Sequence, residues 1–244
     1  MVENPMPGGF VNRVVRVGNT VRREPGERAE FVRRLLHHFE EQGWDGAPRF
    51  LGTDAQGRDV FTYLAGHVAY RPTGPEVSEP DTLVRVARLV RRFHDLTAGT
   101  PLAGGQEVVC HNDLSPKNTV YDLGGHTARP IAFIDWDLAA PGVRIHDVAH
   151  MCWQYLYLGP DVRDVGETAT RMRLLCDAYG LDDRSAVIDT ILWWQDRCRH
   201  GIEERAAAGS PAMVALRDAG VPCAIRASST WIRAHRPLLQ SHLT

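Results

Sequence analysis

Hydrophobic and polar positions change their spacing several times along the chain, and each change predicts a new element. Near the start they alternate, as in a β-strand, on both sides of a turn at Gly18-Asn19, which predicts a hairpin. The spacing then becomes helical and stops at Gly43, after which two more alternating runs follow. The predicted elements are strands over 11–17, 20–23, 49–52 and 59–64 and a helix over 26–42.

The rest of the chain is mostly helical in pattern. Residues 67–80 are rich in proline and glycine, which suits a connector, and an amphipathic helix is predicted over 81–96. Short apolar runs that predict strands lie at 108–110, 119–121 and 131–134. After Asp147 the pattern stays helical, with breaks near 159–160, 180, 209–211 and 220–222.

These elements predict an α+β protein with two lobes. We expect a small β-rich lobe over residues 1–66, a linker over 67–80, and a larger, mostly helical lobe over 81–244 that holds a small sheet. A cleft between two lobes is a common place for a ligand.

Composition and charge narrow the class of partner. The 244 residues contain 28 Lys and Arg against 30 Asp and Glu, a net charge of −2, which gives no basic excess for nucleic acid. No apolar run approaches ~18 residues, and the first residues lack the form of a signal peptide. We therefore expect a cytoplasmic protein with a small-molecule partner, no membrane and no nucleic acid. The five cysteines form no C-x-x-C pair, and we expect them to be reduced core residues.

A single lysine, Lys117, stands beside 27 arginines. Because Lys117 precedes Asn118 rather than Ser or Thr, the chain has no P-loop. Chemistry that usually relies on a buried lysine must here use arginine, which offers a flat fork of donors instead of a point charge. The bias is also what genomic base composition alone would produce.

The strongest chemical signal runs from Cys110 to Asn118. Its skeleton, H-x-D-x-x-x-x-N, has the spacing of a kinase catalytic loop, and Asp135 ends an apolar run 17 positions after Asn118. Phosphoryl transfer explains these residue types, because Asp113 would orient the attacking hydroxyl while an amide and a second carboxylate held Mg²⁺. The alternative is a polar loop with a capping Asp and an unrelated acidic strand end.

With these motifs the sequence resembles the aminoglycoside phosphotransferase and choline kinase-like phosphotransferase family. The resemblance spans residues 7 to about 155. It is carried by segments 8–12, 15–23, 47–52, 111–118, 134–137 and 147–149.

The resemblance implies a two-lobed protein kinase-like fold and ATP- and Mg-dependent transfer to a small-molecule hydroxyl, as on an aminoglycoside-like antibiotic or a metabolite. Asp113 matches the catalytic base of the family. Asn118 and Asp135 match its magnesium ligands, and His111 matches the residue that braces the catalytic loop. Asp137 is a second acid at the same strand end, with a role left open.

The nucleotide site is predicted in the small lobe. Kinases place a phosphate-binding lysine on a strand, and alternation favours Arg23 over Arg22 for this position, with Glu27 or Glu30 as a possible partner. Gly8-Gly9, directly before the hairpin, could bring backbone N–H groups over the phosphates. Tyr63 and Leu64 fall where the resemblance places the hinge that binds adenine.

The chain also departs from the pattern of protein kinases and of its own family. Asp147 follows Asp135 too closely for an activation loop, which disfavours a protein substrate. Asn112 stands where many family members have Gly. Lys117 lies inside the catalytic loop, where it either helps to neutralise the transferred phosphate or faces solvent.

Two other functions stay open at this point. The short small lobe and the missing strand lysine would suit a catalytically silent kinase-like protein that binds a nucleotide or metabolite. His146 and His150, at i and i+4, could hold zinc in a metal-dependent hydrolase, although no third ligand is evident.

Overall fold

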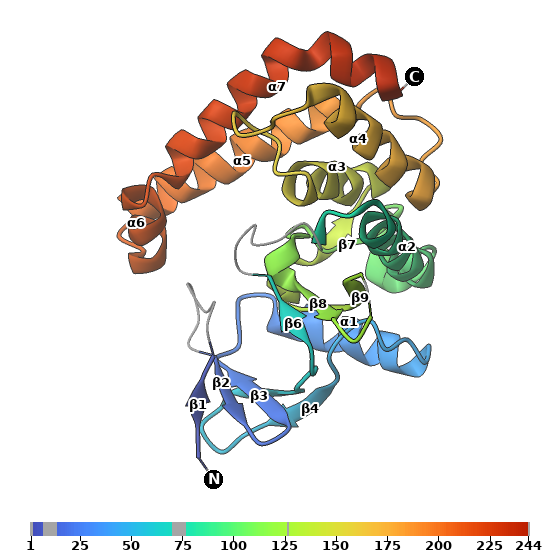
Figure 1. Cartoon of the computed structure of the whole chain (residues 1–244). Helices are drawn as coiled ribbons and strands as arrows, with labels where there is room; N and C mark the ends of the chain where they lie inside the picture. The colour runs from blue at the N-terminus through green and yellow to red at the C-terminus, as the bar shows by residue number, and fades with distance from the viewer. Residues whose placement is uncertain (1, 7–13, 70–76, 126, 244) are drawn as a thin grey trace. The chain divides into compact units, whose positions relative to one another are not determined.

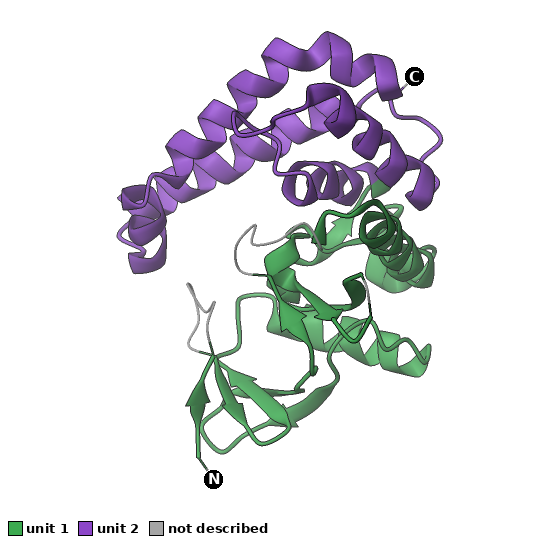
Figure 2. Ribbon diagram, viewed as in Figure 1, with its two compact units in different colours: residues 1–144 green, residues 145–244 purple. Residues whose placement is uncertain are grey.

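The structure is a computed structural model that describes residues 2–6, 14–69, 77–125 and 127–243. The chain divides into two compact units, residues 1–144 and 145–244 (Figure 2). The first unit therefore contains both the predicted small lobe and the predicted catalytic loop. The division into lobes over 1–66, 67–80 and 81–244 stays a prediction, and residues 70–76 of the linker lie outside the described residues.

An antiparallel sheet of five strands forms the N-terminal part of the first unit, in the order β1-β2-β3-β5-β4. Figure 1 labels β1, β2, β3 and β4 of this sheet. Gly18 takes a φ of +60° in the turn between β2 and β3, a conformation that glycine adopts without steric cost. The strands are β1 (Asn4–Pro5), β2 (Val15–Val17), β3 (Thr20–Arg23), β4 (Phe50–Thr53) and β5 (Asp59–Thr62), with helix α1 (Ala29–Glu41) between β3 and β4.

Two smaller sheets position the predicted catalytic loop. Strands β6 (His67–Val68), β8 (Thr119–Asp122) and β9 (Arg129–Phe133) form one, and β7 (Val108–Cys110) pairs with β10 (Ala140–Gly142) in the other. The loop leaves β7, makes the short 3-10 turn η3 (Pro116–Asn118) and enters β8, and the 3-10 turn η4 (Trp136–Leu138) follows β9.

Trp136 joins these elements into one core. Its side chain is 1% exposed, and its ring lies 5.2 Å from Phe39 of α1 and 5.1 Å from Phe93 of helix α2 (Pro80–Thr97). Its indole N–H donates to the carbonyl of Phe133 at 3.0 Å. The apolar stripe of each helix thus packs against the turn that carries the acidic strand end.

The second unit is helical in all of its described secondary structure. Asp164 caps α4 by accepting the backbone N–H of Glu167 at 2.9 Å, and Gly180 ends that helix with a φ of +78°. Helices α5 and α7 lie side by side, with α6 between them in sequence (Figure 1). The helices are α3 (Arg144–Tyr155), which begins at the unit boundary, α4 (Val165–Tyr179), α5 (Val187–Ala207), α6 (Pro211–Asp218) and α7 (Val221–Leu243).

The α+β class is confirmed, and so are the predicted elements that lie in the described residues, which exclude residues 11–13 of the first predicted strand. Three short strands of the described segments were missed. Strand β1 pairs with β2, β10 pairs with β7, and β6 lies inside the predicted connector, where it pairs with β8. Ala69 and Val77, from the two ends of the same stretch, are buried with Tyr121. A strand of two or three residues is too short to show a periodic pattern, and its pairing partner is distant in sequence.

The described residues also bear on the other expectations from composition. None of the helices in the described segments is long and apolar enough to cross a membrane. None of the five cysteines forms a disulfide in the described structure, and Cys110, Cys152 and Cys176 are buried. The expectation of core residues is wrong for Cys223, which is exposed, while Cys198 is intermediate.

Candidate active site

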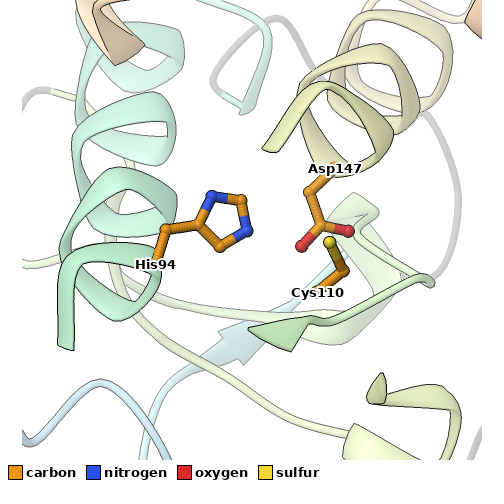
Figure 3. A group of neighbouring side chains, drawn as sticks. All are labelled: His94, Cys110 and Asp147. Atoms are coloured by element: carbon orange, nitrogen blue, oxygen red, sulfur yellow. The ribbon is translucent and has the colours of Figure 1, made fainter. Parts of the chain in front are cut away.

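The catalytic loop begins at a strand with no exposed side chain. Val108, Val109 and Cys110 are each 0% exposed, and the Cys110 thiol donates to the carbonyl of Val143 at 3.3 Å. Figure 3 shows Cys110 projecting from β7 and His94, which is also fully buried, projecting from α2. The buried strand β7 therefore anchors the start of the loop that carries the polar residues after Cys110.

His111 ties the loop to the end of β9. Its Nε2–H donates to the carbonyl of Ile134 at 3.0 Å, and its Nδ1 accepts the backbone N–H of Asp113 at 3.3 Å. These two bonds require the neutral tautomer with the proton on Nε2. The ring is fully buried, 4.5 Å from that of Trp136, which fits the predicted bracing role.

Asn112 turns the chain between His111 and Asp113 in a left-handed conformation. Its φ is +64°, and its side-chain amide donates to the carbonyl of Leu138 at 2.9 Å. Asparagine tolerates this region better than most residues, although glycine meets no steric cost there. A glycine, which the resemblance places here in many family members, would suit the same left-handed backbone.

Asp113 and Asn118 face each other across the loop. The Asn118 amide nitrogen donates to the backbone carbonyl of Asp113 at 2.8 Å and to its carboxylate Oδ2 at 2.7 Å. Since the nitrogen is held in this way, the amide oxygen is the Asn118 atom that could bind a cation. The Lys117 ammonium also lies 3.6 Å from Asp113 Oδ2, with its side chain 52% exposed.

The pairing of β8 with β9 brings Asp135 to the same place. The backbone N–H of Ile134 donates to the carbonyl of Asn118 at 2.9 Å, and Thr119 is opposite Phe133. Asp135 follows Ile134 directly and takes a φ of +63°, a conformation that costs energy for a residue with a Cβ atom. Its carboxylate is half-exposed.

Arg23 lies between the two acids of this strand end. Its guanidinium donates to both carboxylate oxygens of Asp137, one of them at 2.9 Å, and to Asp135 Oδ1 at 3.2 Å. The Arg23 side chain is only 15% exposed. Arg22, the next residue on β3, instead reaches Asp54 at 3.4 Å, and the exposed Glu27 and Glu30 are not among the carboxylates paired with Arg23 in the described structure.

Asp137 is the acid most affected by its surroundings. Burial raises the pKa of its carboxyl above the usual range, the Arg23 guanidinium opposes this shift, and the nearby Asp135 carboxylate adds to it. A Cβ atom built on Gly26 would lie 3.7 Å from the Asp137 carboxyl group, so the chain before α1 passes close to this acid. The role of Asp137 was left open by its sequence pattern, and no local signal predicts its pairing with Arg23.

The donor set fits a hard divalent cation. Asn118, Asp135 and Asp137 offer an amide oxygen and two carboxylates, which are the oxygen ligands that Mg²⁺ prefers. The Arg23 guanidinium already bridges Asp135 and Asp137, so this pair of acids accommodates positive charge.

The predicted nucleotide contacts are only partly described. Tyr63 and Leu64 follow β5 and are half-buried, and Tyr63 donates its backbone N–H to the carbonyl of Asn19 at 2.9 Å. The Arg16 guanidinium stacks on the Tyr63 ring at 3.6 Å. Gly8 and Gly9 lie outside the described residues.

The alternative zinc site gains no support. The His146 ring stacks on Trp193 at 5.0 Å, and the buried His150 packs edge-on against Trp194 at 5.2 Å. Within the described residues, no group of three or more potential His, Cys, Asp or Glu ligands includes either histidine. The two imidazoles are packed against tryptophan rings.

Comparison with known proteins finds a family model that matches part of the chain and a relative that aligns over nearly its full length. Residues 98–180 match the model described as the phosphotransferase enzyme family. The trifolitoxin immunity protein of Rhizobium leguminosarum bv. trifolii is 30% identical over 270 residues, an alignment that covers 98% of this chain and 97% of that protein.

Solved structures resemble most or all of the chain at low sequence identity. A choline/ethanolamine kinase family protein from Mesorhizobium loti is 16% identical with a TM-score of 0.62, covering 100% of this chain and 92% of that one. An aminoglycoside phosphotransferase from Streptomyces rimosus, solved in complex with ADP and streptomycin, is 18% identical with a TM-score of 0.59, covering 79% and 90%. These similarities confirm the predicted kinase-like fold.

Proposed function

Because this chain belongs to the phosphotransferase enzyme family, we propose that it transfers the γ-phosphoryl group of ATP, with Mg²⁺, to a hydroxyl group of a small molecule. One observation carries the proposal. The β8–β9 pairing joins the loop that holds Asp113 and Asn118 to the strand end that holds Asp135, beside the Arg23 guanidinium. A base, a set of oxygen ligands and a phosphate-binding cation are the parts that phosphoryl transfer needs.

Asp113 would act on the acceptor hydroxyl. The hydroxyl oxygen forms a bond to the γ-phosphorus, while the bond from that phosphorus to the bridging oxygen breaks and ADP leaves with the electron pair. The hydroxyl proton passes to the Asp113 carboxylate. Asn118 fixes that carboxylate by its bond to Oδ2, so the base is oriented before the acceptor arrives.

Asn118 and Asp135 would hold the magnesium ion, with Asp137 as a further carboxylate at the same strand end. When bound, the ion neutralises charge on the phosphate oxygens. Asp135 is suited to this task because its left-handed backbone turns the half-exposed carboxylate out of the strand.

Arg23 would bind the α- and β-phosphates, the role that a strand lysine has in protein kinases. Its guanidinium is delocalised, carries several donors and stays charged, which suits bidentate contacts with phosphate oxygens. In the structure these donors are used by Asp135 and Asp137. We therefore expect ATP and Mg²⁺ to bind together, since Asp135 and Asp137 would hold the cation while the Arg23 guanidinium would pair with the phosphates.

The remaining nucleotide contacts are proposed for two segments, residues 63–64 and residues 8–9. Tyr63 already donates its backbone N–H to Asn19, so the Leu64 backbone is the better candidate to hydrogen-bond adenine at the hinge. Gly8 and Gly9 would cover the phosphates with their backbone N–H groups.

The acceptor is an antibiotic-like molecule or a metabolite. The structural relative solved with streptomycin and the relative named an immunity protein both favour a toxic compound that phosphorylation would inactivate. A second candidate function is therefore protection against a toxin, carried out by the same phosphoryl transfer. The catalytically silent nucleotide- or metabolite-binding protein stays the alternative to catalysis.

The substitution Asp113→Asn tests the catalytic assignment. It keeps the size of the side chain but removes the proton acceptor, so we expect transfer to fall about 10²–10⁴-fold, the usual contribution of a general base. Binding of MgATP, measured by calorimetry, should stay near that of the wild type. Unchanged turnover in this variant would show that Asp113 is not the base.

A further inference from the structure

Lys117 is the only lysine of the chain, and it lies beside the predicted base. It sits in η3, directly before Asn118, but the two neighbours differ in exposure. Asn118 is 5% exposed, whereas half of the Lys117 side chain is accessible. The ammonium therefore lies near Asp113 and is accessible to a ligand.

The two cations Arg23 and Lys117 pair with different acids of the candidate site. Arg23 belongs to Asp135 and Asp137, the acids of the strand end, and Lys117 belongs to Asp113. Both the Lys117 ammonium and the Asn118 amide reach Oδ2 of Asp113, which leaves Oδ1 for an acceptor hydroxyl. Because the Lys117 ammonium lies 3.6 Å from Oδ2, a phosphoryl group transferred to a hydroxyl at Oδ1 would pass close to Lys117.

We propose that Lys117 binds the oxygens of the transferred γ-phosphoryl group and is a catalytic residue, an inference that rests on the proposed phosphotransferase function. Negative charge on these oxygens is stabilised by a preplaced cation that need not be drawn from water. The Asp113 carboxylate keeps the ammonium in place until the nucleotide binds.

A lysine suits this position better than the arginine that the chain uses elsewhere. An arginine next to Asp113 could form a bidentate pair with both carboxylate oxygens and so occupy the one needed by the acceptor. An ammonium on a flexible stem holds one oxygen and can follow the phosphoryl group during transfer.

The single lysine makes a direct binding test possible. Acetylation with an N-hydroxysuccinimide ester, followed by peptide mass spectrometry, reports on Lys117 because no other side chain of the protein carries an ε-amine. We expect a non-hydrolysable ATP analogue with Mg²⁺ to slow acetylation of Lys117 several-fold. ADP with Mg²⁺ should leave the rate near that of the free protein, because ADP lacks the γ-phosphate.

Kinetics supply the second measurement. Lys117→Met should lower kcat about 10²-fold, as loss of one oxyanion-binding donor does, with little change in KM for ATP. The kcat of Lys117→Arg should fall between those of the wild type and Lys117→Met. The arginine keeps the positive charge but can occupy both carboxylate oxygens of Asp113. Arg173→Met is the matched control, because Arg173 and Asp177 form an exposed i,i+4 pair at 3.7 Å, and it should behave as wild type.

The outcomes separate this proposal from the one on which it rests. If both nucleotides raise the melting temperature but protect Lys117 equally or not at all, or if Lys117→Met keeps the wild-type kcat, the role of Lys117 is overturned alone. If neither nucleotide changes the melting temperature, nucleotide binding fails and both proposals are overturned.

Discussion

At the scale of single residues, the decisive feature is that neighbouring arginines on one strand have different partners. Alternation along β3 turns Arg23 toward Asp135 and Asp137 and Arg22 toward Asp54. The two side chains are alike in charge and size and differ only in direction. The chain thus offers a matched pair of variants for testing the phosphate contact.

We predict that Arg23→Ala raises KM for ATP about ten- to hundredfold, because hydrogen bonds between charged groups contribute ~1.5–3 kcal/mol. Steady-state kinetics at saturating acceptor would measure this effect. Arg22→Ala should leave KM for ATP near the wild-type value. Equal behaviour of the two variants would remove Arg23 from the nucleotide site and would favour genomic base composition as the cause of the arginine bias.

At the scale of elements, the site depends on a junction of two helices and two turns. Trp136 contacts α1 through Phe39, α2 through Phe93 and the catalytic loop through His111. Asp135 and Asp137, on either side of Trp136, are held in place by its burial. Packing in the core of the first unit therefore sets the position of two candidate ligands.

The substitution Trp136→Ala should lower the free energy of unfolding by about 3–5 kcal/mol, the usual cost of emptying a large buried aromatic site. Urea unfolding followed by circular dichroism would measure it. Trp193→Ala, which removes a tryptophan that is 45% exposed, is the control and should cost much less. A loss at Trp136 no larger than at Trp193 would contradict the role of this junction.

At the scale of the whole molecule, the sequence was informative where chemistry is local. The spacing of His111, Asp113 and Asn118 identifies the loop, and hydrophobic periodicity predicts the helices and longer strands. The ion pair between Arg23 and Asp137 joins residues 114 positions apart, and its partners follow from how the sheets pack. No local pattern could predict that pair, nor the two-residue strand β6 within the proline-rich connector.

The fold does not determine the acceptor substrate, because one kinase-like fold serves many substrates. The family and the donor set favour phosphoryl transfer, while the similar proteins carry names as different as choline/ethanolamine kinase, aminoglycoside phosphotransferase and trifolitoxin immunity protein. The acceptor therefore has to be identified by detecting the phosphorylated product.

The most direct test of phosphoryl transfer is to incubate the protein with MgATP and a panel of aminoglycosides, macrolides, amino alcohols and sugars. Release of ADP and the mass of each acceptor would be followed together. The account predicts that at least one acceptor gains a single phosphoryl group, with equimolar ADP formed and none formed when Mg²⁺ is chelated. Binding of MgATP with no acceptor modified across the panel would contradict it and would identify the chain as a catalytically silent nucleotide-binding member of its family.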